Sequence, residues 1–216
     1  MSTPDLRVVL ATRNAAKLAE LRRIVQATLD QPAAAGSGRR LMVIGLADVP
    51  PFHEPPETEP TFAGNALLKA RAARQATGLT ALADDSGLCV DALNGMPGVL
   101  SARWAGAARS DAANNALLLD QLHDIPDLRR GAHFAAAVAL CTADGVEHVT
   151  HGKMPGTVLR APRGSGGFGY DPLFVPDGSP GRTSAELRPE EKDALSHRGA
   201  ALHAMVPTLL DLLTTS

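Results

Sequence analysis

The spacing of apolar residues along the first part of the chain predicts a strand, a helix and a second strand. Residues 6–12 and 41–46 are almost wholly apolar, which is typical of strands covered on both faces. Residues 14–30 instead repeat apolar side chains at helical spacing, namely at Leu18, Leu21, Val25 and Leu29. Asn14 is suited to cap this helix, and residues 31–40 form a connector rich in small residues.

The middle of the chain repeats this alternation. Helices are predicted over residues 62–78, where a glycine ends the pattern, and over residues 110–124, where Ser110 is the expected cap. The strand between the two helices carries two adjacent acids, Asp84 and Asp85. The chain therefore places a pair of carboxylates at the end of an apolar strand.

The second half adds a hairpin and a last helix. An Asp-Gly step within residues 132–154 indicates two strands joined by a tight turn, and residues 156–160 predict a further short strand. Residues 161–178 are glycine-rich and irregular, whereas residues 196–215 predict a helix that Pro207 kinks. Strands that first alternate with helices and then form a hairpin predict a mixed α/β sheet.

Composition and charge narrow the class of protein. The 216 residues are 44% hydrophobic and 20% charged, which suits one domain or two lobes with a sizeable core. A net charge of −2 provides no general positive field, so we expect no nucleic-acid polymer as a partner. The only cysteines, Cys89 and Cys141, have no metal-ligand spacing and fit a reducing cytoplasm. We expect no signal peptide and no membrane span.

Two stretches are candidates for binding a polyphosphate and a metal. Asp84 and Asp85 either form turn and ion-pair contacts or serve as a metal ligand and a general base, since hard cations prefer carboxylate oxygen. Thr12, Asn14 and Lys17 lie where a strand passes into a helix, where backbone N–H groups attract phosphate. The alternative for this second stretch is an Asn14 that only caps and a solvated lysine.

Two other stretches offer groups that suit a nucleotide base. Phe168 and Tyr170 lie in a glycine-rich loop, where they either stack on a flat base or anchor the loop in the core. Lys192, His197 and Arg198 are clustered, and the last two lie in a predicted first helical turn, where cations oppose the helix dipole. The cluster is either solvent-facing or donates hydrogen bonds to a ligand.

A proline-rich acidic loop precedes the second helix. Residues 50–60 contain Glu57 and are too rich in proline for regular structure. Asn65 and Lys69 follow four residues apart, hence on one face of the helix. The loop is therefore able to bring a carboxylate toward Asp84 and Asp85, or it is an ordinary solvated loop.

Together and in this order, these stretches resemble the non-standard purine nucleoside triphosphate pyrophosphatases, the house-cleaning enzymes for inosine and xanthosine triphosphates. The resemblance covers nearly the whole chain, through VVLATRNAAKLAEL, ETEPTFAGNALLKARAA, ADDSGLCVDALNGMPGVLSARWAG, GSGGFGYDPLFVP, TSAEL and EEKDALSHRGAAL. Arg13 stands where a smaller residue is frequent, Trp104 replaces the usual tyrosine, and residues 31–40 resemble an insertion.

The resemblance implies a single pyrophosphatase domain over residues 1–216, with an elongated mixed twisted sheet flanked by helices and two lobes around a central cleft. It implies a cytoplasmic homodimer that uses Mg²⁺ to cleave inosine, deoxyinosine or xanthosine triphosphate into the monophosphate and pyrophosphate. A magnesium-bound water would attack the α-phosphorus, with Asp85 as base, Glu57 and Asp85 at the metal, and Lys69 catalytic.

The substrate-binding residues that the resemblance implies are Thr12, Arg13, Asn14, Ala15, Ala16, Lys17, Ser86, Phe168, Gly169, Tyr170, Asp171, Lys192, His197 and Arg198. His197 and Arg198 would lie at the base, where donors favour the 6-oxo group of inosine and xanthosine over the amino group of adenine. Two alternatives stay open: a nucleotide-binding regulator without hydrolysis, and a related pyrophosphatase for modified pyrimidine nucleotides. The acids favour hydrolysis, because a pure anion binder gains nothing from carboxylates beside phosphate unless a metal is present.

Overall fold

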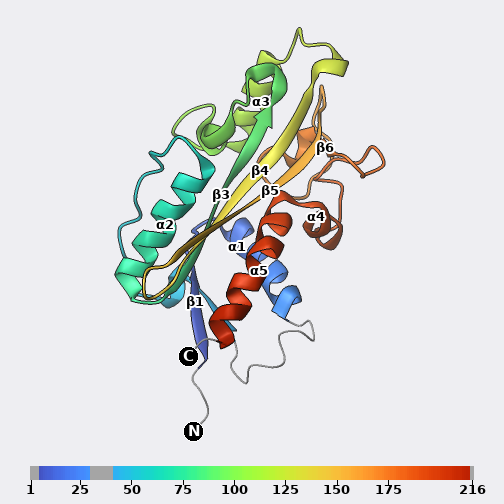
Figure 1. Cartoon of the computed structure of the whole chain (residues 1–216). Helices are drawn as coiled ribbons and strands as arrows, with labels where there is room; N and C mark the ends of the chain where they lie inside the picture. The colour runs from blue at the N-terminus through green and yellow to red at the C-terminus, as the bar shows by residue number, and fades with distance from the viewer. Residues whose placement is uncertain (1–4, 30–40, 215–216) are drawn as a thin grey trace. The chain divides into compact units, whose positions relative to one another are not determined.

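The computed structural model describes residues 5–29 and 41–214, which form six strands and five α-helices joined by turns (Figure 1). The strands are β1 (Leu6–Leu10), β2 (Leu41–Gly45), β3 (Thr80–Val90), β4 (Gly131–Cys141), β5 (Glu147–Val158) and β6 (Phe174–Pro176). The helices are α1 (Ala15–Leu29), α2 (Phe62–Thr77), α3 (Asp111–Gln121), α4 (Pro189–Leu195) and α5 (His197–Thr214).

The strands pair in the order β2-β1-β3-β4-β5-β6. β1 pairs in parallel with both β2 and β3, whereas β5 and β6 pair antiparallel. The sheet is therefore mixed, and the prediction of an α/β protein with a mixed sheet flanked by helices is confirmed. The turn between β4 and β5 contains the predicted Asp-Gly step, and the Gly145 amide donates to the Thr142 carbonyl over 2.9 Å.

The described residues divide into two compact units. β3, β4 and β5 each have one part in the first unit and the other part in the second. Among the described residues, the first unit comprises residues 5–29, 41–85, 137–151 and 198–214, and the second comprises residues 86–136 and 152–197. The prediction that both belong to one pyrophosphatase domain around a cleft stays a prediction.

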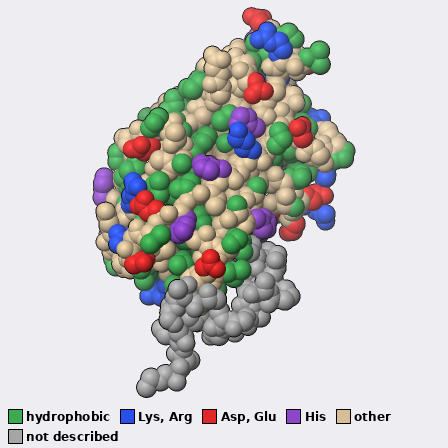
Figure 2. Space-filling view, in the orientation of Figure 1, with side chains coloured by type: hydrophobic (Ala, Val, Ile, Leu, Met, Phe, Trp, Pro, Cys, Tyr) green, Lys and Arg blue, Asp and Glu red, His purple; other side chains and the backbone are tan. Residues whose placement is uncertain are grey.

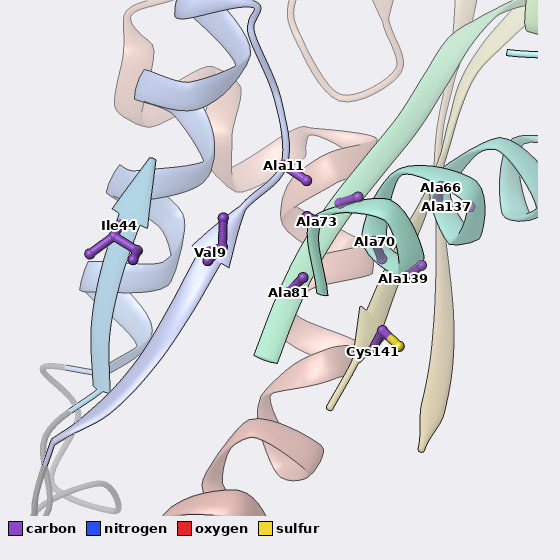
Figure 3. Close-up of a cluster of buried hydrophobic side chains, with 11 residues drawn as sticks. Val9, Ala11, Ile44, Ala66, Ala70, Ala73, Ala81, Ala137, Ala139 and Cys141 are labelled. Atoms are coloured by element: carbon purple, nitrogen blue, oxygen red, sulfur yellow. The ribbon is translucent and has the colours of Figure 1, made fainter. Parts of the chain in front are cut away.

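The core of the first unit lies between α2 and the strands. Small side chains of α2, at Ala66, Ala70 and Ala73, pack against Val9 of β1 and Ala81 of β3 (Figure 3). Alanine at these positions lets the helix approach the sheet closely. Figure 1 shows α1 and α5 on the other side of these strands from α2. The acids that follow Ala83 are therefore presented from a strand buried on both faces.

The core of the second unit is aromatic and aliphatic. Its buried members include Leu88 of β3, Leu118 of α3, Phe134 of β4 and Phe174 of β6, and the rings of the two phenylalanines meet edge to face at 4.8 Å. Arg130 lies buried just before β4, and its guanidinium donates to three main-chain carbonyls, those of Leu122, Val158 and Leu159.

Most predicted elements are present. One predicted strand is not separate, and two short elements were not predicted. Residues 156–160 do not form a separate strand, because the alternation of buried and exposed residues continues unbroken from Gly152 to the end of β5 at Val158. The short elements β6 and α4 lack a pattern long enough to predict them. The predicted last helix is present from His197 to Thr214 and contains Pro207, and the kink there stays a prediction. Residues 31–40 lie outside the described part of the chain.

On the face shown in Figure 2, acidic and basic side chains are interspersed. Within residues 5–29 and 41–214, no helix combines the length and the apolar stretch needed to cross a bilayer.

Replacement of Arg130 by Met should lower the free energy of unfolding by about 3 kcal/mol or more, because it leaves buried carbonyls without a donor. Denaturant unfolding measures this change. The matched control is Arg160→Met: Arg160 also donates to two carbonyls and to Asp127, but its side chain is 54% exposed. We expect a loss of about 1 kcal/mol or less there. Equal losses for both variants would contradict the role given to Arg130.

Candidate active site

Asp84 and Asp85 are adjacent on β3 and contact different elements. The Asp84 carboxylate contacts Lys17 of α1 and Arg198 of α5, whereas the Asp85 carboxylate contacts residues of α2. This separation follows from strand geometry, because successive side chains point to opposite faces of a sheet. The two acids consequently have different partners, burial and pKa.

Asp84 is the centre of a buried ion-pair network. Its Oδ2 accepts from Lys17 Nζ at 3.1 Å and from Arg198 Nε at 3.2 Å, and its side chain is 1% exposed. Arg198 Nη1 also donates to Glu20 Oε2 at 3.0 Å. Burial by itself raises the pKa of the Asp84 carboxyl, but Lys17 and Arg198 outweigh it and hold the pKa well below its ordinary value. Asp84 is therefore charged throughout the neutral range.

Asp85 is held by two side chains of α2. Asn65 Nδ2 donates to its Oδ2 at 3.2 Å, and Lys69 Nζ donates to its Oδ1 at 2.9 Å. Lys69 Nζ also contacts Glu57 Oε1 at 2.6 Å. The expected common face of Asn65 and Lys69 is confirmed, and so is the approach of the acidic loop to the acid pair.

The surroundings of Asp85 favour its neutral form more than those of Asp84 do. Burial raises the pKa of the Asp85 carboxyl and outweighs the opposing effect of Lys69. The pKa of Lys69 is raised in turn, because Asp85 and Glu57 together outweigh the lowering effect of its burial. A carboxylate with a raised pKa is a better proton acceptor at neutral pH than one whose pKa is depressed.

The turn before α1 has the predicted cap. The Lys17 amide donates to Asn14 Oδ1 at 3.1 Å, and the Asn14 amide donates to Thr12 Oγ1 at 3.3 Å. Lys17 is not solvated, because its ammonium group is bonded to Asp84. Burial lowers the pKa of Lys17. Ala15 and Ala16 are the first residues of α1, and their side chains lie outside the described part of the structure.

Arg13 projects from the same turn toward the proline-rich loop. Its Nε donates to Glu54 and its Nη2 to the Phe52 carbonyl at 3.4 Å. Its side chain is 68% exposed. The contact of Arg13 with phosphate stays a prediction.

Sequence reasoning missed Glu20 and the role of Asn65 as a clamp. Glu20 is 3% exposed, and a signal for its burial exists in its neighbours, because Leu21 and Ile24 form the buried stripe of α1. Lys17 lies three residues earlier on the same helical face. Asn65 accepts from the Glu59 amide at 3.0 Å and donates to the Glu59 carbonyl at 3.3 Å, so it also fixes the end of the acidic loop.

In the second unit, Asp171 organises the glycine-rich loop. Its carboxylate accepts from the Phe168 amide at 2.8 Å and from Lys192 Nζ at 2.6 Å. The Lys192 ammonium also lies 5.0 Å from the centre of the Phe168 ring. Gly167 has a φ of 71°, and a Cβ there would lie 2.1 Å from Asp171 Oδ2. That glycine is therefore required by the Asp171 contact, whereas the sequence interpretation was close approach of a ligand.

The two aromatic residues of this loop differ. Tyr170 is 3% exposed, and its hydroxyl donates to the Ser101 carbonyl at 2.9 Å, so the anchoring alternative describes it. Phe168 is partly exposed beside Lys192. Gly169 is fixed through its main chain, which donates to Asp111 at 2.7 Å and accepts from Asn115 at 3.0 Å.

His197 and Ser86 complete the predicted set in the second unit. The His197 ring is buried and stacks on Phe134, with 5.0 Å between the ring centres and 12° between the planes. Ser86 follows Asp85 on β3 and is partly exposed. The structure therefore gathers the predicted residues into two sets, one in each unit. Substrate contact by any of them stays a prediction.

The residues around Lys69 are chemically suited to a divalent cation. Glu57 and Asp85 each direct a carboxylate oxygen at the Lys69 ammonium group, at 2.6 and 2.9 Å. One positively charged group therefore lies between the two acids. Among the described residues there is no group of three or more acidic, histidine or cysteine side chains suited to a metal. Two carboxylates are the donor set that Mg²⁺ takes when substrate phosphates and waters supply the remaining ligands.

Comparison with known proteins gives consistent matches over nearly the whole chain. A family model described as the Ham1 family matches residues 8–208. A protein of Nocardia farcinica named dITP/XTP pyrophosphatase is 60% identical over 206 residues, which are 95% of this chain and 96% of that protein.

Two solved structures are also similar. A nucleoside-triphosphatase, also titled dITP/XTP pyrophosphatase, from Mycobacterium abscessus has 54% identity and a TM-score of 0.73, over 94% of this chain and 100% of that one. A HAM1 protein from Coxiella burnetii has 41% identity and a TM-score of 0.78, over 95% and 99% of the two chains.

Replacement of Asp84 by Asn should lower the free energy of unfolding at pH 7 by about 3–5 kcal/mol, because Lys17 and Arg198 lose their shared buried counter-charge. The folded-state pKa of Asp84 is lowered, so its stabilisation is present above the ordinary value of 3.8 and is lost as the pH falls below it. Denaturant unfolding at several pH values should show the difference between wild type and variant shrinking in acid.

The control for this experiment is Asp48→Asn. Asp48 lies 3.6 Å from Arg22 with 52% of its side chain exposed, so its removal should cost about 1 kcal/mol or less. A loss for Asp84→Asn no larger than that of the control would be incompatible with the network.

Proposed function

Because this chain belongs to the Ham1 family, we propose that it hydrolyses non-standard purine nucleoside triphosphates, namely those of inosine, deoxyinosine and xanthosine. The products are the nucleoside monophosphate and pyrophosphate. The relatives named dITP/XTP pyrophosphatase support this substrate class. The observation that carries the proposal is the arrangement of Asp85, Lys69 and Glu57, in which a carboxylate of raised pKa lies beside a cation and a second carboxylate.

In this proposal Asp85 is the general base. Its carboxylate accepts a proton from a water molecule while the water oxygen forms a bond to the α-phosphorus. The bond between the α-phosphorus and the oxygen that bridges it to the β-phosphorus breaks, and pyrophosphate leaves with that electron pair. Asn65 and Lys69 each hold one carboxylate oxygen, at 3.2 and 2.9 Å, which orients the base. General-base assistance of this kind is worth about 10²–10⁴ in rate.

The phosphate charges require cations, and the first unit provides candidates. Thr12, Asn14 and Lys17 lie at the start of α1, where main-chain N–H groups and a lysine favour phosphate. Glu57 and Asp85 would hold Mg²⁺. When bound, the metal supplies positive charge to the phosphate oxygens and stabilises the charge that develops in the reaction. Lys69 contacts both of these acids and keeps them paired.

The candidate groups for the nucleoside come from the second unit, apart from Arg198, which belongs to the first. Phe168 offers a partly exposed ring, and Lys192 and Asp171 fix its position. We propose that His197 and Arg198 donate to the 6-oxo group, that Ser86 contacts the substrate, and that Gly169 and Tyr170 shape the loop. A buried site built for an oxo acceptor disfavours adenine, since an amino group would leave its donors unpaired.

Two other functions are distinguished by one assay. Pyrophosphate release is measured side by side for inosine, xanthosine, adenosine and methylated pyrimidine triphosphates, with and without Mg²⁺. Release from the inosine and xanthosine nucleotides alone supports the proposal. Release from the pyrimidine nucleotides would favour the related pyrophosphatase, and binding without release would favour a regulator.

We further propose a cytoplasmic location and a homodimer. Cys89 and Cys141 are both free thiols, which supports a reducing compartment. Size-exclusion chromatography with light scattering measures the oligomeric state directly.

Asp85→Asn should retain the fold and lower kcat for inosine triphosphate by about 10²–10⁴-fold, because the amide cannot accept the proton. Steady-state pyrophosphate release measures the loss, and circular dichroism checks the fold. Glu147→Gln is the control, since Glu147 pairs with Arg71 of α2, whose side chain is 47% exposed. Near-full activity of Asp85→Asn would show that Asp85 is not the base.

Chelation of divalent ions should abolish turnover, and added Mg²⁺ should restore it. Glu57→Gln should raise the Mg²⁺ concentration for half-maximal rate by about ten-fold or more, since even residues behind the ligands change metal affinity by that amount. A Mg²⁺ titration of the initial rate measures both effects. Unchanged turnover in excess chelator would remove the metal from the proposal.

A further inference from the structure

Arg13 joins the turn before α1 to the proline-rich loop. Its guanidinium donates through Nε to Glu54 and through Nη2 to the Phe52 carbonyl at 3.4 Å. These two partners are 41 and 39 residues away in sequence. One side chain therefore holds both a main-chain and a side-chain group of the segment that leads to Glu57.

The loop depends on such side-chain contacts. Five of the residues between 50 and 60 are proline, which has no N–H to donate, so the segment cannot pair as a strand or wind as a helix. Phe52 packs against the core of the first unit, Glu57 is bonded to Lys69, and Glu59 is bonded to Asn65. Arg13 provides the anchor at Glu54, between Phe52 and Glu57.

The connection from Glu54 to Glu57 is stiff. Pro55 and Pro56 separate the two acids, and each proline ring fixes its own φ. A residue that precedes proline is itself restricted to extended conformations, so Glu54 and Pro55 lose further freedom. Because few dihedral angles remain free across this step, fixing Glu54 limits where Glu57 lies.

We propose that Arg13 is a positioning residue, which holds the loop through Glu54 and Phe52 and so places Glu57 beside Lys69 and Asp85. This role differs from a direct contact with phosphate. Of this proposal, only the assignment of Glu57 to the metal rests on the proposed function. The placement of the loop itself is independent of any activity.

The expected effect is small because the ion pair is exposed. The Arg13 and Glu54 side chains are 68% and 30% exposed, and exposed pairs shift equilibria by about two- to five-fold. The matched control is Arg22→Ala, which removes an exposed arginine from an ion pair outside the loop. Arg22 pairs with Asp48 at 3.6 Å with 47% of its side chain exposed, and Asp48 lies before the loop.

The first test is hydrogen exchange of the full-length protein without nucleotide or metal. Arg13→Ala and Glu54→Gln should each speed exchange of the amides of residues 52–54 and 57–59 by about two- to five-fold. The double variant should equal Arg13→Ala, because Arg13→Ala already removes the contact that Glu54→Gln weakens, together with the bond to the Phe52 carbonyl. Unchanged exchange in both single variants, or effects that add in the double variant, would overturn the proposal.

The second test separates positioning from phosphate contact. Both variants should raise the Mg²⁺ concentration for half-maximal pyrophosphate release by about two- to five-fold, with the loss restored at saturating Mg²⁺. If Arg13 instead contacts phosphate, Arg13→Ala raises KM for the nucleotide and Glu54→Gln does not, which would overturn the proposal. A wild-type protein without pyrophosphate release would refute the proposed function, while the exchange experiment would still decide the role of Arg13.

Discussion

The part of the candidate site in the first unit depends on the pairing of one buried carboxylate, that of Asp84, with Lys17 and Arg198. A charge removed from water is tolerated only when it is paired. Lys17 and Arg198 lie in the first turns of α1 and α5, where cations oppose the helix dipole, and the negative charge of Asp84 offsets that cost. The pairing therefore fixes the starts of two helices against the same strand, and with them the neighbouring Asp85.

Asp84 and Asp85 are adjacent and of the same residue type, but they consequently have separate roles. Asp84 is surrounded by cations and keeps its charge as part of the framework. Asp85 faces α2, where one amide and one ammonium group hold it and burial raises its pKa. The strand alternation that separates the two side chains by face is thus what allows a structural charge and a proton acceptor to stand side by side.

Local patterns were sufficient for much of the fold and part of the site. The first strand and helix, the Asn14 cap and the common face of Asn65 and Lys69 follow from spacing of a few residues. Contacts over long sequence separations do not follow from spacing, as with the bond from Arg198 to Glu20 or from Arg13 to Glu54. Burial decided between the alternatives for Tyr170. Residue spacing does not distinguish Asp84 from Asp85: the resemblance alone singled out Asp85, and the different partners of the two acids are seen only in the structure.

Asn65 shows how chemical ageing would affect this protein. Its side chain donates to both Asp85 and the Glu59 carbonyl from a position that is 1% exposed. Deamidation would convert it to aspartate, a side chain of nearly the same shape that cannot donate these bonds and that adds a like charge beside the base. The deamidated protein would keep helix α2, but Asp85 would lose the bond from Asn65 and gain a neighbouring negative charge. Burial within a regular helix protects the amide from this reaction. The packing of α2 therefore also determines the rate at which Asn65 deamidates.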